Sequence, residues 1–304
     1  MMHIKGLDRL REKLPDYPGR RILLFPLGVL LTTCMGYLLL LSVDVLPRLF
    51  PGVDVLVAVE PYLPIIGSLT MSVISLRLIA RMWTRRASMK ALYGPLAYQK
   101  VVRNGLAGVA LIPSLLLHAA TSIRSVPLGS PVNYVTIQWS RSLLPILGVP
   151  AEVDVILRVL CFSTIFAIGL LTTLSAFFTF GVDYMVVLYL YFPEESEVQN
   201  HEIYSLLRHP AYFSAILYAL SVIALRFSIY SLIIALAVCL LVRVHIRREE
   251  AELIERFGQS YVDYMGSVPA LHVRPRDLRA FFRCLVRGIR QRTAEQAEPS
   301  SSEH

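Results

Sequence analysis

The sequence predicts an all-α protein that crosses a membrane about six times and carries a helical hairpin near its C-terminal end. Hydrophobic residues make up 55% of its 304 residues and charged residues only 17%, against roughly 45–50% and about 25% in average globular proteins. The apolar residues form long blocks, and several approach the roughly 20 residues that a helix needs to cross a bilayer. This pattern excludes a soluble globular domain and a disordered chain.

Six apolar blocks are expected to be the spans. The first block carries no charge and is too long for a cleavable signal peptide. The last two blocks are separated only by Arg226 and Phe227, which requires a tight helical hairpin, and the fifth block is short for a span. The blocks cover residues 22–42, 61–80, 105–123, 155–180, 210–225 and 228–244.

Basic residues are distributed unequally over the connections between these blocks. The N-terminal tail and the second connection carry six Lys or Arg each, and the chain from Arg243 onward carries eleven, whereas the opposite side holds five. The positive-inside rule therefore places both termini in the cytoplasm. The basic residues behind the net charge of +8 are placed as membrane topology requires. We therefore expect no nucleic-acid partner. Three of the four cysteines lie inside apolar blocks, so we expect neither a disulfide framework nor a metal site.

The C-terminal tail is amphipathic. Between residues 275 and 292, Leu and Phe side chains share one helical face and arginines occupy the other. Two interpretations fit this pattern: an interfacial helix on anionic lipid, or a helix packed on the protein's own cytosolic surface. Residues 293–304 are expected to be disordered. We therefore divide the chain into an N-terminal membrane region with three spans (1–154), a catalytic membrane core (155–272) and this tail (273–304).

Polar residues gather at both ends of the predicted hairpin. Arg208 and His209 directly precede the fifth block, and Glu249 and Glu250 follow the sixth. A hairpin brings these two ends to the same membrane surface, and polar groups inside a membrane protein mark functional sites. Taken singly, Pro210 could simply begin a helix with Arg208 on lipid phosphate, and the two glutamates could form an ordinary solvated helix end.

These residues resemble the isoprenylcysteine carboxyl methyltransferase family, whose members are integral membrane enzymes that use S-adenosylmethionine. The resemblance covers about a fifth of the chain, and its motifs are Arg208-His209-Pro210-Ala211-Tyr212 and Glu249-Glu250-x-x-Leu253-x-x-x-Phe257-Gly258-x-x-Tyr261-x-x-Tyr264. It implies a methyltransferase that acts on a lipophilic acceptor inside the bilayer, with an isoprenylcysteine carboxylate as the first choice. The catalytic residues would be Arg208, His209 and Glu250.

The same resemblance implies which residues hold the cofactor. The two glutamates suit its amino and ribose groups, and the Arg-His pair suits its carboxylate. Tyrosine rings could stack near the adenine or the sulfonium. The full set is Tyr204, Arg208, His209, Pro210, Tyr212, Glu249, Glu250 and Tyr261.

Two departures from the family pattern leave other functions open. Ser214 stands where glycine is usual, and the acidic residues 183–202 replace an Asn-Phe-x-His stretch. An acidic connection repels a carboxylate acceptor and favours a cationic or neutral headgroup. The alternatives are therefore N-methylation of an aminophospholipid or other lipid, a sterol-reductase-like enzyme that uses NADPH, and a non-enzymatic membrane scaffold.

Overall fold

The computed structural model describes residues 4–121 and 129–297, and within these residues all regular structure is helical. This result confirms the predicted all-α class. Short 3-10 turns join the α-helices, whose bounds are α1 (Leu7–Glu12), α2 (Leu24–Leu49), α3 (Asp54–Val59), α4 (Leu63–Thr84), α5 (Arg86–Tyr93), α6 (Ala97–Thr121), α7 (Tyr134–Ser140), α8 (Ala151–Phe180), α9 (Val182–Met185), α10 (Pro210–Arg226), α11 (Ile229–Phe257), α12 (Gln259–Ser267) and α13 (Leu278–Ala297).

Five helical stretches among the described residues are long and apolar enough to cross a membrane, so the chain is an integral multi-pass membrane protein. The sixth expected span, block 210–225, corresponds to α10, which is apolar but has only 17 residues. Residues 122 and 123 at the end of the third expected span lie outside the described residues. The five stretches are Gly19–Leu49, Asp54–Thr84, Arg86–Thr121, Ala151–Phe180 and Ile229–Phe257.

The chain divides into two compact units, and α1, α8, α10 and α11 contribute residues to both. Unit 1 comprises Met1–Leu10, Ala167–Ala215 and Ile246–His304, and unit 2 comprises Arg11–Phe166 and Ile216–His245.

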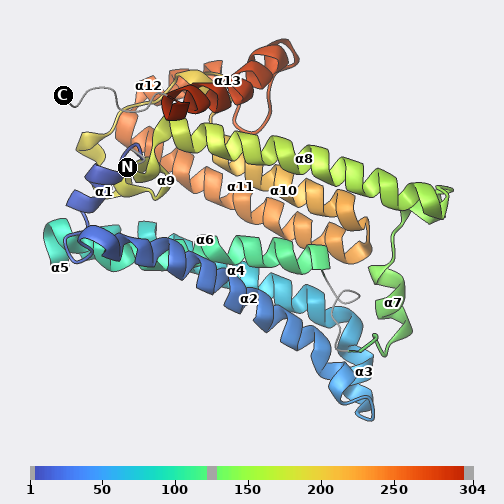
Figure 1. Cartoon of the computed structure of the whole chain (residues 1–304). Helices are drawn as coiled ribbons and strands as arrows, with labels where there is room; N and C mark the ends of the chain where they lie inside the picture. The colour runs from blue at the N-terminus through green and yellow to red at the C-terminus, as the bar shows by residue number, and fades with distance from the viewer. Residues whose placement is uncertain (1–3, 122–128, 298–304) are drawn as a thin grey trace. The chain divides into compact units, whose positions relative to one another are not determined.

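Within unit 2, α6 packs along both α2 and α4 (Figure 1). Small residues permit this close approach, as is usual where membrane helices meet. A Cβ atom at Gly108 would lie 2.6 Å from Ile79 Cγ1, and one at Gly105 would lie 2.0 Å from Met82 Sδ. The Ser75 hydroxyl donates to the carbonyl oxygen of Gly108 at 2.8 Å. The glycines of α6 therefore favour close packing of this helix against α4.

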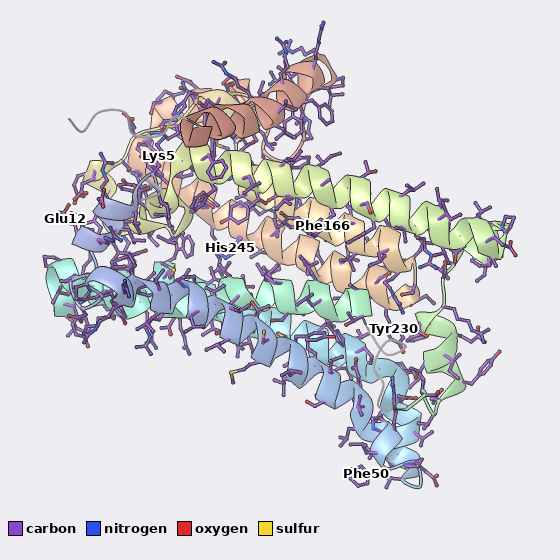
Figure 2. All side chains as sticks on the ribbon, in the orientation of Figure 1. Lys5, Glu12, Phe50, Phe166, Tyr230 and His245 are labelled. Atoms are coloured by element: carbon purple, nitrogen blue, oxygen red, sulfur yellow. The ribbon has the colours of Figure 1, made fainter. Side chains whose placement is uncertain are left out.

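Buried polar side chains connect the same three helices near one end of the bundle. His118 of α6 lies between Asp44 of α2, at 2.6 Å from its Nε2, and Ser68 of α4, at 3.2 Å from its Nδ1. All three side chains are buried. Tyr230, labelled in Figure 2, donates its hydroxyl to the carbonyl oxygen of Pro61 at 2.9 Å and thereby ties the start of α11 to this unit. Because an isolated polar group is costly inside a bilayer, these pairings fix the helices in one register.

The last helix, α13, contributes to a buried cluster of unit 1. Phe281 and Leu285 of α13 are buried against Ala176 of α8 and against Ile203 and Tyr204. Of the two interpretations of the amphipathic tail, packing on the protein's own surface is thus observed. The helix continues to Ala297, into the stretch that was expected to be disordered from residue 293, and residues 298–304 lie outside the described residues.

Candidate active site

The predicted site residues lie in unit 1, at the ends of three helices. Arg208 and His209 directly precede Pro210, which begins α10 because a proline fits the first position of a helix. Glu249 and Glu250 lie in the last turns of α11. Tyr261 lies in α12, which starts immediately after Gly258 (φ +58°), a backbone conformation that favours glycine.

Arg208, Glu250 and His209 form one hydrogen-bonded cluster. Arg208 Nη2 donates to Glu250 Oε1 at 2.8 Å, and His209 Nε2 lies 3.1 Å from the same oxygen. The side chains of Arg208 and Glu250 are only 9% and 17% exposed. The structure therefore brings together the three residues that the sequence marks as catalytic, and it does so across the predicted hairpin.

Arg208 also anchors the chain that follows α12. Its Nη1 donates to the carbonyl oxygen of Met265 at 2.7 Å and to that of Val268, and its backbone N–H donates to the carbonyl oxygen of Pro269 at 2.9 Å. The guanidinium thus has most of its donors engaged within the protein, and Arg208 Nε is buried without a hydrogen-bond partner in the part of the chain that the structure describes. These contacts give Arg208 a positioning role that the sequence did not predict.

Glu249 lies among three tyrosines. Its Oε2 atom is buried and has no hydrogen-bond partner among the described residues. Tyr212 forms a hydrogen bond with this carboxylate. Burial and the charge of Glu249 raise the pKa of Tyr204 and that of Tyr261 well above the usual value. Like an ordinary phenol, each is neutral at physiological pH and can donate a hydrogen bond.

Two further residues of the motif region, Tyr264 and Ser214, have structural contacts. Tyr264 donates its hydroxyl to the carbonyl oxygen of Tyr204 at 2.6 Å, which holds α12 against the segment before α10. Ser214 is buried, and its hydroxyl accepts a hydrogen bond from Thr173 of α8 at 2.9 Å. A glycine at this position would lose that bond.

Unit 1 contains a cavity of about 780 Å³, and the sequence did not predict all of the residues that line it. Residues of the acidic connection line it, and so do Lys5, Gly6 and Arg9 of the N-terminal segment. Their contribution could not be found in the sequence, because they reach residues more than 170 positions away, as in the bond from Arg9 to Tyr189. Among the described residues no group of three or more His, Cys, Asp or Glu side chains could hold a metal ion.

Residues 157–260 match the family model of phospholipid methyltransferases (PEMT). The match supports a membrane methyltransferase that acts on lipophilic substrates, and it confirms the resemblance at the level of this broader family. It includes every predicted site residue except Tyr261, which follows its last residue. No curated protein and no solved structure matches the chain.

The anchoring role of Arg208 gives a first prediction. We expect Arg208→Ala to lower the free energy of unfolding by about 3 kcal/mol, because Glu250 is then left buried without its cationic partner. The measurement is thermal unfolding of the full-length protein in detergent. Arg248→Ala on the exposed side of α11 is the matched control, and equal midpoints for the two variants would contradict the role.

Proposed function

We propose that the protein transfers a methyl group from S-adenosylmethionine to a lipophilic acceptor in the bilayer. The observation that carries the proposal is the buried carboxylate oxygen of Glu249, which has no hydrogen-bond partner among the residues that the structure describes. It lies among Tyr204, Tyr212 and Tyr261, and the Arg208–Glu250 pair next to it holds the helix ends in place. The match to phospholipid methyltransferases supports the same reaction class.

The described residues fit this cofactor. A buried carboxylate oxygen without a partner suits the ammonium or a ribose hydroxyl of the cofactor, since each is a hydrogen-bond donor. Tyrosine faces suit its sulfonium and adenine. Arg208 and His209 would donate hydrogen bonds to the cofactor carboxylate from those N–H groups that are not bonded to Glu250. When bound, the cofactor supplies an already activated methyl group.

What the chain must contribute is position and exclusion of water. Attack has to be in line with the bond that breaks, so the acceptor must be held within a few ångströms of the methyl carbon. Tyr204 and Tyr261 are buried and Tyr212 is partly buried, so the surroundings of Glu249 exclude much of the solvent. Arg208, Glu250 and His209 keep α10 and α11 at a fixed separation, which fixes the place of Glu249.

Two kinds of methyl acceptor are compatible with the proposed reaction, and each is favoured by a different observation. The motifs from Arg208 to Tyr212 and from Glu249 to Tyr264 favour an isoprenylcysteine carboxylate. The acidic cavity wall and the family description favour an aminophospholipid. Both are lipophilic and would enter from the bilayer.

We further propose that both termini face the cytoplasm and that α13 lies on anionic lipid there. Leu278, Phe282 and Val286 are exposed along one side of α13 even though Phe281 and Leu285 are buried. Exposed arginines, Arg279 and Arg283 among them, flank this exposed stripe. Such a helix binds an anionic membrane surface through both its apolar and its basic side chains.

The cofactor assignment predicts specific losses of affinity. We expect Glu249→Gln, Glu250→Ala and Arg208→Ala each to weaken S-adenosylhomocysteine binding by roughly 1.5–3 kcal/mol, the range for hydrogen bonds to charged groups. Calorimetry on the full chain in detergent measures this. Glu255→Gln, at an exposed position of the same helix, is the control. Unchanged affinity in all three variants, or binding of NADPH in place of S-adenosylhomocysteine, would refute the assignment.

The two acceptors predict different pH–rate profiles. A carboxylate acceptor, with a reference pKa near 3.5, is ionised throughout and predicts a nearly flat rate from about pH 6 to 9. An amine must lose a proton before it attacks, so its rate rises with pH over the same range. Initial rates with a farnesylcysteine analogue and with phosphatidylethanolamine, both in nanodiscs, distinguish them. Turnover of the phospholipid alone would exclude the carboxylate.

The orientation and the lipid contact are tested together in proteoliposomes. We expect a membrane-impermeant reagent to modify Ala91→Cys from the cytoplasmic side and Ser130→Cys from the opposite side only. We also expect brominated anionic lipid to quench a Phe282→Trp variant more strongly than brominated neutral lipid does, because the arginines concentrate anionic lipid. Equal quenching by the two lipids would remove the anionic partner from the proposal.

A further inference from the structure

The N-terminal segment, residues 4–10, is bonded to the end of α8 and the start of α9, more than 170 positions later in the chain. The backbone N–H of Val182 donates to the carbonyl oxygen of Lys5 at 2.9 Å, and Lys5 Nζ, labelled in Figure 2, donates to the carbonyl oxygen of Thr179. A helix end leaves such backbone groups without an intrahelical partner. The segment therefore supplies partners for them where α8 ends and α9 begins.

Two glycines allow this close contact. Gly6 has a φ of +78°, and a Cβ atom there would lie 1.8 Å from Asp183 Oδ1. Gly181 has a φ of +96°, and a Cβ atom there would lie 2.7 Å from the same oxygen and 2.9 Å from the carbonyl oxygen of Lys5. Asp183 between them is only 2% exposed. A larger residue at position 6 would therefore push the N-terminal segment away from Asp183.

Arg9 connects the N-terminal segment to the same carboxylate a second time. Its Nη1 donates to the Tyr189 hydroxyl at 2.9 Å, and this hydroxyl donates to Asp183 Oδ2 at 2.5 Å. Asp183 lies in α9, and Tyr189 lies in the 3-10 turn that follows it. The segment is thus fixed both to α9 and to the turn after α9.

A stack of four aromatic rings leads from these contacts to the proposed cofactor residues. The ring of Tyr189 lies 4.2 Å from that of Tyr184, which lies 4.6 Å from Phe180, and Phe180 lies 3.8 Å from Tyr204, all measured between centroids. Tyr204 is close enough to Glu249 for its charge to raise the phenol pKa. Rings packed this closely cannot move independently. A displacement of α9 therefore either shifts Tyr204 or opens a gap in the stack.

We propose that the N-terminal segment is a positioning element of the candidate active site, in which Gly6 and Arg9 fix the place of Tyr204 through Asp183 and the ring stack. The inference rests on the proposed binding of S-adenosylmethionine beside Tyr204. It adds to the site a segment that lies outside the residues matched to the family. Gly6 and Arg9 act through other residues, so loss of their contacts lowers cofactor affinity while the helices remain folded.

The test compares two glycine variants of the full chain in detergent, with calorimetric binding of S-adenosylhomocysteine as the readout. We expect Gly6→Ala to weaken binding by roughly fivefold or more, because its methyl group overlaps Asp183 and displaces the segment. Gly19→Ala is the matched control. Gly19 also has a positive φ (+54°), but beyond its chain neighbours no described atom lies within 4 Å of its Cβ position, so affinity should stay within twofold. Equal affinities in the two variants would overturn the proposal.

A double-mutant cycle tests whether the effect passes through the ring stack. Phe180→Leu removes the ring between Tyr184 and Tyr204. If the N-terminal segment acts through this ring, Gly6→Ala should cost little further affinity in the Phe180→Leu background, because coupled residues are not additive. A segment that only stabilises the fold would give additive losses, and additive losses would overturn the positioning role.

Failure of the cofactor assignment gives a different result from failure of this inference. Hydrogen exchange of the unliganded protein needs no cofactor, and Gly6→Ala should speed exchange at residues 182–190 and 202–207 relative to Gly19→Ala. If the wild-type protein does not bind S-adenosylhomocysteine but exchange rises at both places, the cofactor proposal fails and the positioning of Tyr204 stands. Unchanged exchange at residues 202–207 overturns the positioning.

A second pair of variants is available should Gly6→Ala fail to fold. Arg9→Leu removes the donor to Tyr189, whereas Arg9→Lys keeps a cationic donor there. We expect Arg9→Leu to weaken binding of S-adenosylhomocysteine and Arg9→Lys to restore most of the affinity. Wild-type affinity in Arg9→Leu would overturn the proposal.

Discussion

The Arg208–Glu250 ion pair determines the geometry of the candidate site. It joins the residue before α10 to the last turns of α11, and the same guanidinium holds the chain after α12 through two carbonyl oxygens. Three segments thus meet at one side chain. A lysine could not replace it, because only the guanidinium offers several donors in fixed directions. The neighbouring Glu249 depends on this arrangement, since its place is set by the position of α11 relative to the segment before α10.

The pairing also changes how the motif should be understood. From the sequence, Arg208 and Glu250 would each contact a cofactor group directly. In the structure they largely satisfy each other, and within the motif it is Glu249 that keeps a buried carboxylate oxygen without a partner among the described residues. The motif therefore combines residues that build a site with a residue that is open to a ligand. Sequence similarity alone does not distinguish a residue that holds the site together from one that binds the ligand.

Features with a local cause were predictable from the sequence. Apolar blocks indicate the spans by length, and a connection of two residues forces α10 and α11 into a hairpin that brings Arg208 to Glu250. Contacts that depend on the path of the chain were not predictable. The bonds from Arg208 to the carbonyl oxygens of Met265 and Val268 require the turn at Gly258, and the bond from Arg9 to Tyr189 joins residues 180 positions apart. Neither has a signature in composition or periodicity.

The buried polar cluster of unit 2 has a consequence for how the protein enters the membrane. Asp44 lies in the first long apolar helix, and its partner His118 is made 74 residues later. An aspartate without a partner costs roughly 2.5–3.5 kcal/mol at the centre of a spanning helix, and less near the end of a helix, where Asp44 lies. We therefore expect α2 to remain weakly inserted, or in contact with the insertion machinery, until α6 is synthesised and supplies the imidazole. Stable insertion of the first long helix would then depend on a hydrogen bond to the third, and would follow its synthesis.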